Sequence, residues 1–252
     1  MEKSWCKACI NTILRSLKMQ LISDWEINEL VRSSNESGVY KSRRLEWIQK
    51  KNISVVFDVG ANEGQYAQEL YEAGYVGSVV SFEPLSDAFA SLKNRAQAIP
   101  NWKVVNTALG EKEGFSLINV AGNSQSSSLL TMLGRHEESC PESKCYTQEK
   151  IRVERLASHW KQHCENDESI WLKIDVQGFE LSVLKGAGDF LRKAAAIELE
   201  LSLVPLYEGQ PLMCDLIRFL NENGFSLVAM QEIFSDPETR ETLQIDGIFL
   251  KS

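Results

Sequence analysis

Short apolar runs and longer amphipathic segments alternate along the chain from residue 51 onward. The strand-like pattern occurs at 53–57, 78–83 and 102–105, and helix-like patterns follow the first two runs at 66–73 and 86–97. Continuous apolar runs of this length are typical of buried parallel strands. The repeated alternation of strand and helix predicts an α/β domain with a mostly parallel sheet.

The second half of the chain continues the alternation and ends in two strand-like runs. Further strand patterns lie at 115–120, 151–156, 170–175 and 195–201, and helix patterns lie at 180–188 and 212–223. The last two runs, 225–230 and 245–250, are separated by turn residues at 236–239. We therefore expect an antiparallel hairpin at one edge of the sheet.

Residues 121–147 interrupt this pattern with serines, glycines and charged side chains. The segment is too polar and irregular for a sheet element, so we expect a loop or lid. A long loop in a compact domain is often functional, and this one would help to select a substrate. A surface insertion without function is the alternative.

The first fifty residues carry a helical stripe that includes Ile10, Leu14 and Leu21, and a capping-box pattern at 23–26. We predict an N-terminal helical cap over residues 1–50, followed by one α/β domain over residues 51–252. The cap would pack on the sheet. The alternatives are a lid over the ligand and a homodimer contact through the N-terminal helices.

Composition excludes several classes of partner. The chain has 252 residues, 43% of them hydrophobic, and a net charge of −8, which disfavours binding to nucleic acid or to anionic membranes. No apolar run is long enough for a membrane span and no signal peptide is visible, so we expect a cytoplasmic protein. The six cysteines include one C-x-x-C pair, at Cys6 and Cys9, without a second pair at zinc spacing. We expect free thiols and no metal site.

The most informative stretch joins the first strand to the first helix through Asp58, Gly60, Ala61, Asn62 and Gly64. Its glycines would allow a ligand close to the backbone at the carboxyl end of the strand. The turn lacks the G-x-G-x-x-G pattern of dinucleotide sites and the Lys-Ser/Thr of a P-loop, which argues against a nicotinamide-dependent oxidoreductase. An acid before the glycine suits a ligand with positive charge. A sharp corner without a ligand is the alternative.

A second acid supports the ligand interpretation. Glu83 ends the next predicted strand, 25 residues after Asp58. An acid at this position commonly binds the ribose hydroxyls of a nucleoside.

These residues belong to a series of motifs that resembles the FkbM-type methyltransferases. The motifs lie at 57–66, 82–84, 106–110, 126–129 and 172–180, in the family's order and spacing. The resemblance covers about residues 53–250. It implies a class I, Rossmann-like fold with an open seven-stranded, mostly parallel sheet and helices on both faces. It also implies S-adenosylmethionine as cofactor and a hydroxyl oxygen on a small molecule, such as a sugar or natural product, as the usual acceptor.

The resemblance assigns the cofactor contacts by position. Asp58 would face the amino acid end of the cofactor, Glu83 the ribose, and Ala108 and Leu109 the adenine. The complete set of expected cofactor-binding residues is Asp58, Gly60, Ala61, Asn62, Gly64, Tyr66, Glu83, Pro84, Asn106, Ala108, Leu109 and Asp175.

Transfer to an alcohol is helped by a base that takes the hydroxyl proton. Asp175 is the first candidate because its strand ends beside the cofactor, and Glu180 and His136 follow. A lone histidine in a loop is more often solvated. A metal that lowers the pKa of the alcohol is an alternative, although no ligand spacing in the sequence argues for one.

Two positions depart from the family's pattern. Ala157 and Gln177 stand where relatives commonly have an aspartate and a glutamate. A binding module with reduced catalysis is therefore the competing hypothesis. Glu198 and Glu200 alternate with leucines on a predicted strand, so either one glutamate faces the substrate or both lie on an exposed strand face.

Overall fold

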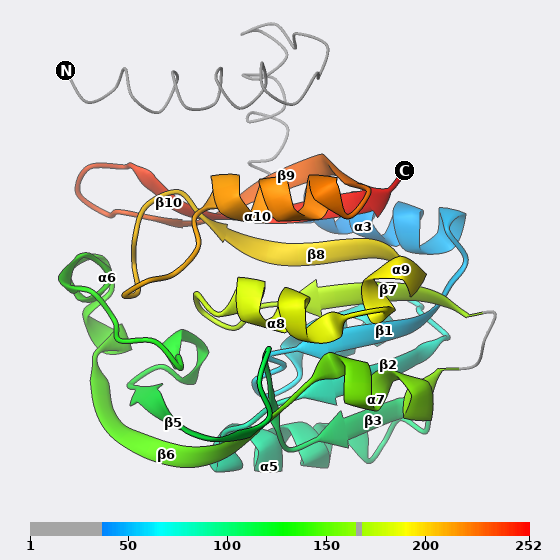
Figure 1. The fold of residues 1–252 in the computed structure, drawn as a ribbon, viewed down its shortest axis with the longest axis horizontal. Helices are drawn as coiled ribbons and strands as arrows, with labels where there is room; N and C mark the ends of the chain where they lie inside the picture. Colours follow the sequence, from blue (N-terminus) through cyan, green and yellow to red (C-terminus); the bar gives the residue numbers. More distant parts are fainter. Residues whose placement is uncertain (1–36, 165–167) are drawn as a thin grey trace, which may run out of the picture.

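The computed structural model describes residues 37–164 and 168–252 and contains a seven-stranded sheet in the order β3-β2-β1-β7-β8-β10-β9 (Figure 1). The strands are β1 (Ile53–Val59), β2 (Ser78–Phe82), β3 (Trp102–Val105), β7 (Ser169–Ile174), β8 (Ala194–Ser202), β9 (Phe225–Ser235) and β10 (Thr242–Lys251). All pairs from β3 to β8 are parallel, whereas β10 is antiparallel to both β8 and β9. The predicted mostly parallel sheet with a late antiparallel hairpin is confirmed.

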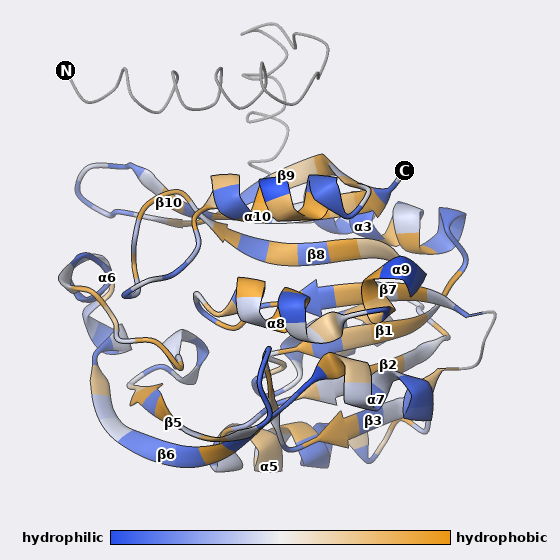
Figure 2. Cartoon of the chain, in the orientation of Figure 1, coloured by the Kyte–Doolittle hydropathy of each residue, from blue (hydrophilic) through white to orange (hydrophobic). Residues whose placement is uncertain are grey.

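Helices cover both faces of this sheet because successive strand residues point to opposite sides. Val55, Phe57 and Val59 join the core beneath α7 (Leu156–His163), α8 (Glu180–Ala187), α9 (Phe190–Lys193) and α10 (Met213–Glu222). Val56 and Trp171 join the core on the opposite face, beneath α3 (Ser37–Lys50), α4 (Gln65–Glu72) and α5 (Ser86–Ala96). Figure 2 shows the central strands as mainly hydrophobic ribbons between these two layers.

A second sheet of three strands, in the order β4-β6-β5, lies near the carboxyl ends of the parallel strands (Figure 1). It consists of β4 (Ala108–Leu109), β5 (Gly114–Ala121) and β6 (Cys145–Glu154). The predicted strand at 151–156 is therefore longer, begins earlier and belongs to this second sheet. Leu156 instead begins α7, a helix that the sequence pattern did not predict.

The segment 121–147 is more ordered in its backbone than the sequence predicted. It contains the short helices η1 (Ser124–Ser126), α6 (Gly134–Ser139) and η2 (Pro141–Ser143), and its last three residues belong to β6. Polar side chains on this part of β6 remain exposed, while the backbone pairs with β5 over the length of that strand. Pairing with a neighbour therefore makes a strand here despite the polar composition.

The N-terminal cap is only partly within the described residues. Its last helix, α3, packs on the sheet through Tyr40 and Ile48, which are buried in the same core as Val56. The helical stripe from Ile10 to Leu21, the capping box and the C-x-x-C pair lie outside the described residues, and the division at residue 50 stays a prediction. Within the described chain, no helix combines the length and apolar character needed to cross a bilayer.

Candidate active site

A cavity of about 470 Å³ opens at the carboxyl edge of the parallel strands. This volume lies within the range of roughly 300–1,000 Å³ that is usual for small-molecule sites. Residues from the ends of β1, β2, β7 and β8 line it, together with β4, η1, α6 and the β9–β10 hairpin. Open α/β sheets bind their ligands at this edge, so the cavity is the candidate active site.

Two rows of polar side chains cross the sheet beneath and beside the cavity, both on the face covered by α3 and α4. Strand register places Asp58 beside Ser81 on one side and Lys173 on the other, and Lys173 beside Glu198. Two residues further along the strands, a second row reaches the carboxyl edge and contributes Glu83, Asp175, Glu200 and Asp246 to the cavity. The two-residue period of a strand thus brings four carboxylates into one cavity.

Gly60 allows the ends of β1 and β7 to approach each other. Its φ is 80°, and a Cβ at this position would lie 1.8 Å from the backbone oxygen of Asp175. The backbone nitrogens of Gly60 and Ala61 donate to the oxygen of Phe82, and Asp175 N donates to Val59 O. Gly60, Ala61 and Asn62 line the cavity.

Gly64 has a different role, because it precedes α4 with a φ of 89° and is not among the cavity-lining residues. A Cβ there would meet Leu92 and Trp102 at 2.7 Å. This glycine therefore serves the packing of α4 against α5 and β3.

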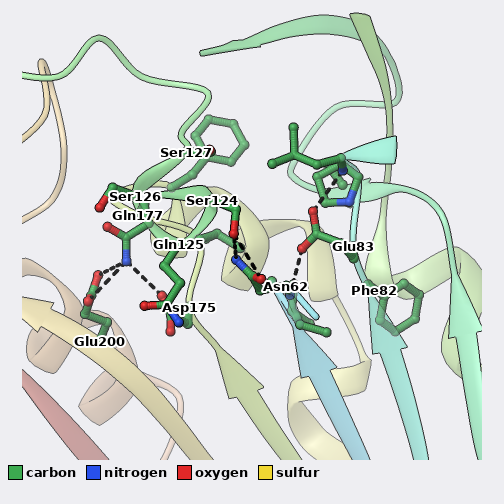
Figure 3. Close-up of a pocket in the computed structure, with 18 of the residues that line it drawn as sticks. Asn62, Phe82, Glu83, Ser124, Gln125, Ser126, Ser127, Asp175, Gln177 and Glu200 are labelled. Atoms are coloured by element: carbon green, nitrogen blue, oxygen red, sulfur yellow. Dashed lines mark hydrogen bonds between the residues drawn. The ribbon is translucent and has the colours of Figure 1, made fainter. Parts of the chain in front are cut away.

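Glu83 is 5% exposed and is held by two backbone groups, Asn62 N and Leu85 N, each donating over 2.8 Å (Figure 3). Burial raises its pKa to about 7. Asn106 does not line the cavity, but its Nδ2 donates to the backbone oxygens of Glu83 and Pro84. Asn106 therefore holds the backbone of the loop that carries Glu83.

The end of the cavity beside Glu83 is apolar. Ala108 and Leu109 on β4 line it together with Leu85, Ile118 and Leu129. Leu85, Ala108 and Ile118 belong to a small apolar cluster between β5, β6 and the start of α5, and Leu129 packs against this cluster. Such a surface suits a flat heterocycle, with the Glu83 carboxylate next to it for hydroxyl groups.

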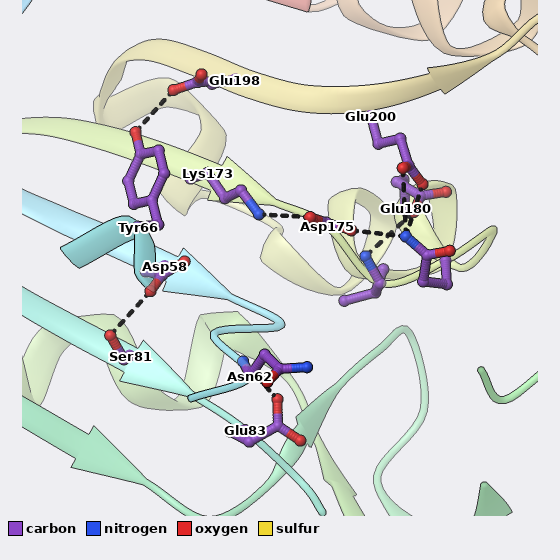
Figure 4. Close-up of polar contacts among 12 residues, drawn as sticks. Asp58, Asn62, Tyr66, Ser81, Glu83, Lys173, Asp175, Glu180, Glu198 and Glu200 are labelled. Atoms are coloured by element: carbon purple, nitrogen blue, oxygen red, sulfur yellow. Dashed lines mark hydrogen bonds and ion pairs between the residues drawn. The ribbon is translucent and has the colours of Figure 1, made fainter. Parts of the chain in front are cut away.

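Asp58 lies one row below the cavity and does not line it. Its Oδ2 accepts a hydrogen bond from Ser81 Oγ over 3.0 Å, and its Oδ1 has no hydrogen-bond partner among the described residues (Figure 4). Complete burial raises its pKa to about 6, although the nearby Lys173 ammonium opposes this shift. Asp58 therefore places an ionisable group beneath the cavity but does not line it.

Tyr66 lines the cavity and connects it to α3. Its hydroxyl donates to Glu198 Oε2 over 2.7 Å, as Figure 4 shows. The ring lies 4.7 Å from the Arg44 guanidinium and 5.6 Å from the Lys173 ammonium. Arg44 is itself buried and pairs with Glu198 over 3.4 Å. The helix α3 thus supports a residue of the cavity wall.

Asp175 stands near the middle of the row of carboxylates. Lys173 Nζ donates to its Oδ2 over 2.9 Å, and Gln177 Nε2 donates to its Oδ1 over 2.9 Å. The same Gln177 nitrogen lies 3.2 and 3.1 Å from the two carboxylate oxygens of Glu200 (Figure 3). Burial raises the pKa of Glu200, and the neighbouring Asp175 charge adds to this shift. Burial also raises the pKa of Asp246 to about 7.

The other two candidate bases lie in different surroundings. Glu180 is not among the lining residues, and its Oε1 accepts from Val176 N and Gly178 N over 3.2 and 3.0 Å. It therefore fixes the loop between β7 and α8. His136 does line the cavity, is 3% exposed and has a pKa lowered to about 4 by burial. The expectation of a solvated histidine is wrong, since α6 packs this ring inside the protein.

Several site residues escaped the sequence analysis, among them Lys173, Gln244 and Asp246. Lys173 and Asp246 carried a usable signal, because each is a charged residue inside a short run of otherwise uncharged, mainly apolar residues, 170–174 and 245–250. The structure also shows that Glu198 and Glu200 are 2% and 6% exposed, so the exposed-face alternative is wrong. Of the two positions that depart from the family's pattern, Gln177 lines the cavity and Ala157 does not.

The chain is similar to known methyltransferases. The family model of the Methyltransferase FkbM domain matches residues 58–227. A curated relative, the 2-O-methyltransferase NoeI of Sinorhizobium fredii, is 26% identical over 194 residues, which cover 74% of this chain and 78% of NoeI.

Solved structures of methyltransferases also match the chain. The methyltransferase FkbM of Methylobacillus flagellatus KT has a TM-score of 0.43 and 16% identity, covering 77% of this chain but only 43% of that protein. Magnesium protoporphyrin IX methyltransferase (ChlM) of Synechocystis PCC 6803, solved with bound SAM, has a TM-score of 0.47 and 12% identity, covering 96% and 90%.

The family model matches most of the α/β domain, including the glycine turn, Glu83 and Asp175. The strand order and the cavity at the carboxyl edge agree with the class I fold expected of this family. The chain belongs to the FkbM methyltransferase family.

Proposed function

We propose that this protein transfers a methyl group from S-adenosylmethionine to a hydroxyl oxygen of a small molecule. The observation that carries the proposal is the arrangement of one cavity, which runs from an apolar end beside Glu83 to a cluster of carboxylates around Asp175. The similarity to the 2-O-methyltransferase NoeI supports oxygen as the acceptor atom.

The lining residues fit this cofactor chemically. Ala108 and Leu109 provide an apolar wall for an adenine, and Glu83 provides a buried carboxylate for ribose hydroxyls. Gly60, Ala61 and Asn62 line the cavity between these two ends and would hold the methionine part of the cofactor. The excess of carboxylates over the single lysine in the described lining favours a ligand with positive charge.

We assign the role of general base to Asp175. When bound, S-adenosylmethionine would supply an electrophilic methyl group on a positively charged sulfur, which would become a neutral thioether once the methyl is lost. Asp175 takes the proton that the acceptor hydroxyl loses. Lys173 and Gln177 donate to the two oxygens of this carboxylate and fix its orientation. Alignment of the reactants contributes most of the acceleration, and a base in reach adds roughly a hundredfold or more.

The proposal is tested with methyl-labelled cofactor and a panel of hydroxylated acceptors. We expect methyl transfer to oxygen, a decrease of about a hundredfold in Asp175→Asn, and no change in Asp189→Asn, an exposed acid outside the cavity. The same reactions are run with a chelator. Inhibition by the chelator would favour a metal-assisted mechanism, and full activity of Asp175→Asn would remove Asp175 as the base. Cofactor binding without methyl transfer to any acceptor would favour the competing hypothesis of a binding module with reduced catalysis.

Cofactor binding is tested separately by calorimetry. Because Glu83 presents the only carboxylate beside the apolar wall in the described cavity, we expect Glu83→Gln to weaken S-adenosylmethionine binding by about 1 to 3 kcal/mol. Glu149→Gln is the matched control, since Glu149 accepts from the neighbouring Ser86 but does not line the cavity. Equal affinities of the wild type and Glu83→Gln would contradict the ribose assignment.

A further inference from the structure

The cavity continues past Asp175 to an end that the cofactor assignment leaves open. In the strand order, β8 and β10 lie beyond β7, on the side away from β2 and Glu83. This end is lined by His136 from α6, by Ile233 and Phe234 from β9, and by Gln244 and Asp246 from β10. It therefore lies on the far side of the proposed base from the apolar adenine wall.

His136 offers this end a polar group that the protein itself does not use. Its ring packs against Tyr207 and Phe234, with centroid distances of 5.2 and 5.3 Å. Nδ1 is buried without a hydrogen-bond partner among the described residues. The other ring nitrogen, Nε2, also has no hydrogen-bond partner among the described residues but is not fully enclosed, so it is the nitrogen available to a ligand hydroxyl in the cavity. Since burial lowers the His136 pKa to about 4, the ring is neutral at physiological pH and adds no positive charge.

The charges around this end restrict the ligand further. Asp175, Glu200 and Asp246 line it, and Lys173 is the only lysine or arginine among the described residues that line the cavity. Lys173 already pairs with Asp175 over 2.9 Å. A phosphate or carboxylate on the ligand would therefore meet carboxylates without an available cation. Neighbouring apolar side chains, Phe234 and the half-exposed Ile233, suit the carbon face of an uncharged ring.

We propose that this end of the cavity is the acceptor subsite, that it takes an uncharged hydroxylated molecule, and that His136 recognises the acceptor by a hydrogen bond instead of removing its proton. This inference rests on the proposed function, because it concerns the acceptor of the same reaction. It assigns His136 a specificity role and leaves proton transfer to Asp175.

The charge preference is tested with acceptor sets that share one ring. Each set contains a neutral methyl glycoside, the matching uronic acid and the matching sugar phosphate, with labelled cofactor in excess. We expect kcat/KM for the neutral member of the accepted set to exceed that of both anionic members by at least about tenfold. An anionic member that is methylated as well as, or better than, the neutral one overturns the proposal. Absence of transfer to every panel member, neutral or charged, counts against the proposed function instead.

The role of His136 is tested with His136→Phe and His136→Gln. The phenylalanine keeps a flat ring but no hydrogen-bonding atom, so we expect the acceptor KM to rise about tenfold or more. Glutamine keeps a polar group and should recover part of that loss. Cofactor affinity, and the acid limb of the pH dependence of kcat, should stay unchanged in both variants. A shifted acid limb, or a fall in kcat with unchanged KM, would show that His136 is the base.

A binding measurement complements the kinetics. The chain has three histidines, His136, His159 and His163, so nitrogen-15 labelling of histidine gives few ring signals to assign. With S-adenosylhomocysteine bound, addition of the accepted neutral glycoside should shift the His136 ring nitrogens and leave His159 and His163 unchanged. Neither of the control residues lines the cavity. An unchanged His136 signal at saturating glycoside overturns the assignment, whatever the variants do to the rate.

Discussion

The side-chain amide of Gln177 donates from Nε2 to Oδ1 of Asp175 over 2.9 Å. The orientation of this amide is fixed from its other end, because the Tyr207 hydroxyl donates to Gln177 Oε1 over 2.8 Å. Gln177 Nε2 also contacts both carboxylate oxygens of Glu200. Gln177 thus supplies a neutral donor at a point where two carboxylates converge, in a backbone conformation with a φ of 54°.

Gln177→Glu should change the pH dependence of methyl transfer. The substitution keeps the size of the side chain but replaces the donor with a third carboxylate facing Asp175 and Glu200. Repulsion between these charges opposes ionisation of the cluster, so the acid limb of kcat/KM should move to higher pH. Loss of the donor that orients Asp175 should also lower the activity near pH 7 by about tenfold, as measured in a pH series of initial rates.

Gln177→Met separates charge from the loss of the hydrogen bond. It should lower the rate across the pH range without moving the acid limb, because it adds no charge. Superimposable pH profiles for the wild type and Gln177→Glu would show that Gln177 does not position the base.

Gly60→Ala should be more destabilising than Gly74→Ala. Both glycines have positive φ, 80° and 91°, so an alanine at either position carries the left-handed cost of roughly 1 to 2 kcal/mol. Only at Gly60 would the new Cβ overlap the backbone of Asp175, whereas nothing lies within 4 Å at Gly74. The free energy of unfolding, measured by urea titration, should be lower in Gly60→Ala by a further 1 to 3 kcal/mol or so. Equal losses in the two variants would mean that the approach of β1 to β7 is not tight.

Arg44→Met should weaken both the fold and the cofactor site, although Arg44 lies outside the family-model match. The buried guanidinium pairs with Glu198 and Glu69 and stacks on Tyr66. Its removal leaves Glu198 buried without this partner, a change that typically costs about 3 to 5 kcal/mol. The adjacent Arg43→Met is the control, because Arg43 does not share these buried contacts. Thermal unfolding and calorimetry with S-adenosylmethionine should separate the two variants, and identical behaviour would contradict a role for α3 in the site.

The stability of the cofactor-free protein should fall as pH rises through the neutral range. Burial raises the pKa of Glu83, Glu180 and Asp246 to about 7, whereas such acids titrate near pH 4 in an unfolded chain. Between about pH 4.5 and 7, the folded state therefore holds protons that the unfolded state has released. The free energy of unfolding decreases across this window, by up to about 1.4 kcal/mol per pH unit for each such group.

Urea titrations at a series of pH values check this slope. Asp246→Asn should make it shallower, because the amide does not titrate, and Asp189→Asn should leave it unchanged because that acid is exposed. Stability that increases from pH 5 to pH 7.5 would contradict the raised pKa values.

The sequence determined the alternation of strands and helices and the three chemical landmarks Gly60, Glu83 and Asp175. These predictions depend on local periodicity and on residues that end a strand, so neighbouring positions in the chain contain the information. The family resemblance added the strand order, which periodicity does not encode. The polar pattern of 121–147 predicted exposure correctly for many side chains but missed β6, because pairing with β5 is a long-range property.

The tertiary structure decided which polar residues share the site. Asp246 meets Glu200 only because β10 inserts antiparallel beside β8, and Arg44 reaches Glu198 only because α3 packs across the sheet from 154 residues away in sequence. Burial then sets the protonation state of these groups. His136, which the sequence pattern placed in a solvated loop, is instead a buried neutral side chain that lines the cavity. Residue type and spacing do not encode desolvation, which depends on how distant segments pack. The sequence by itself therefore identified acidic residues at the carboxyl edge of the sheet, but not which groups in the site are charged.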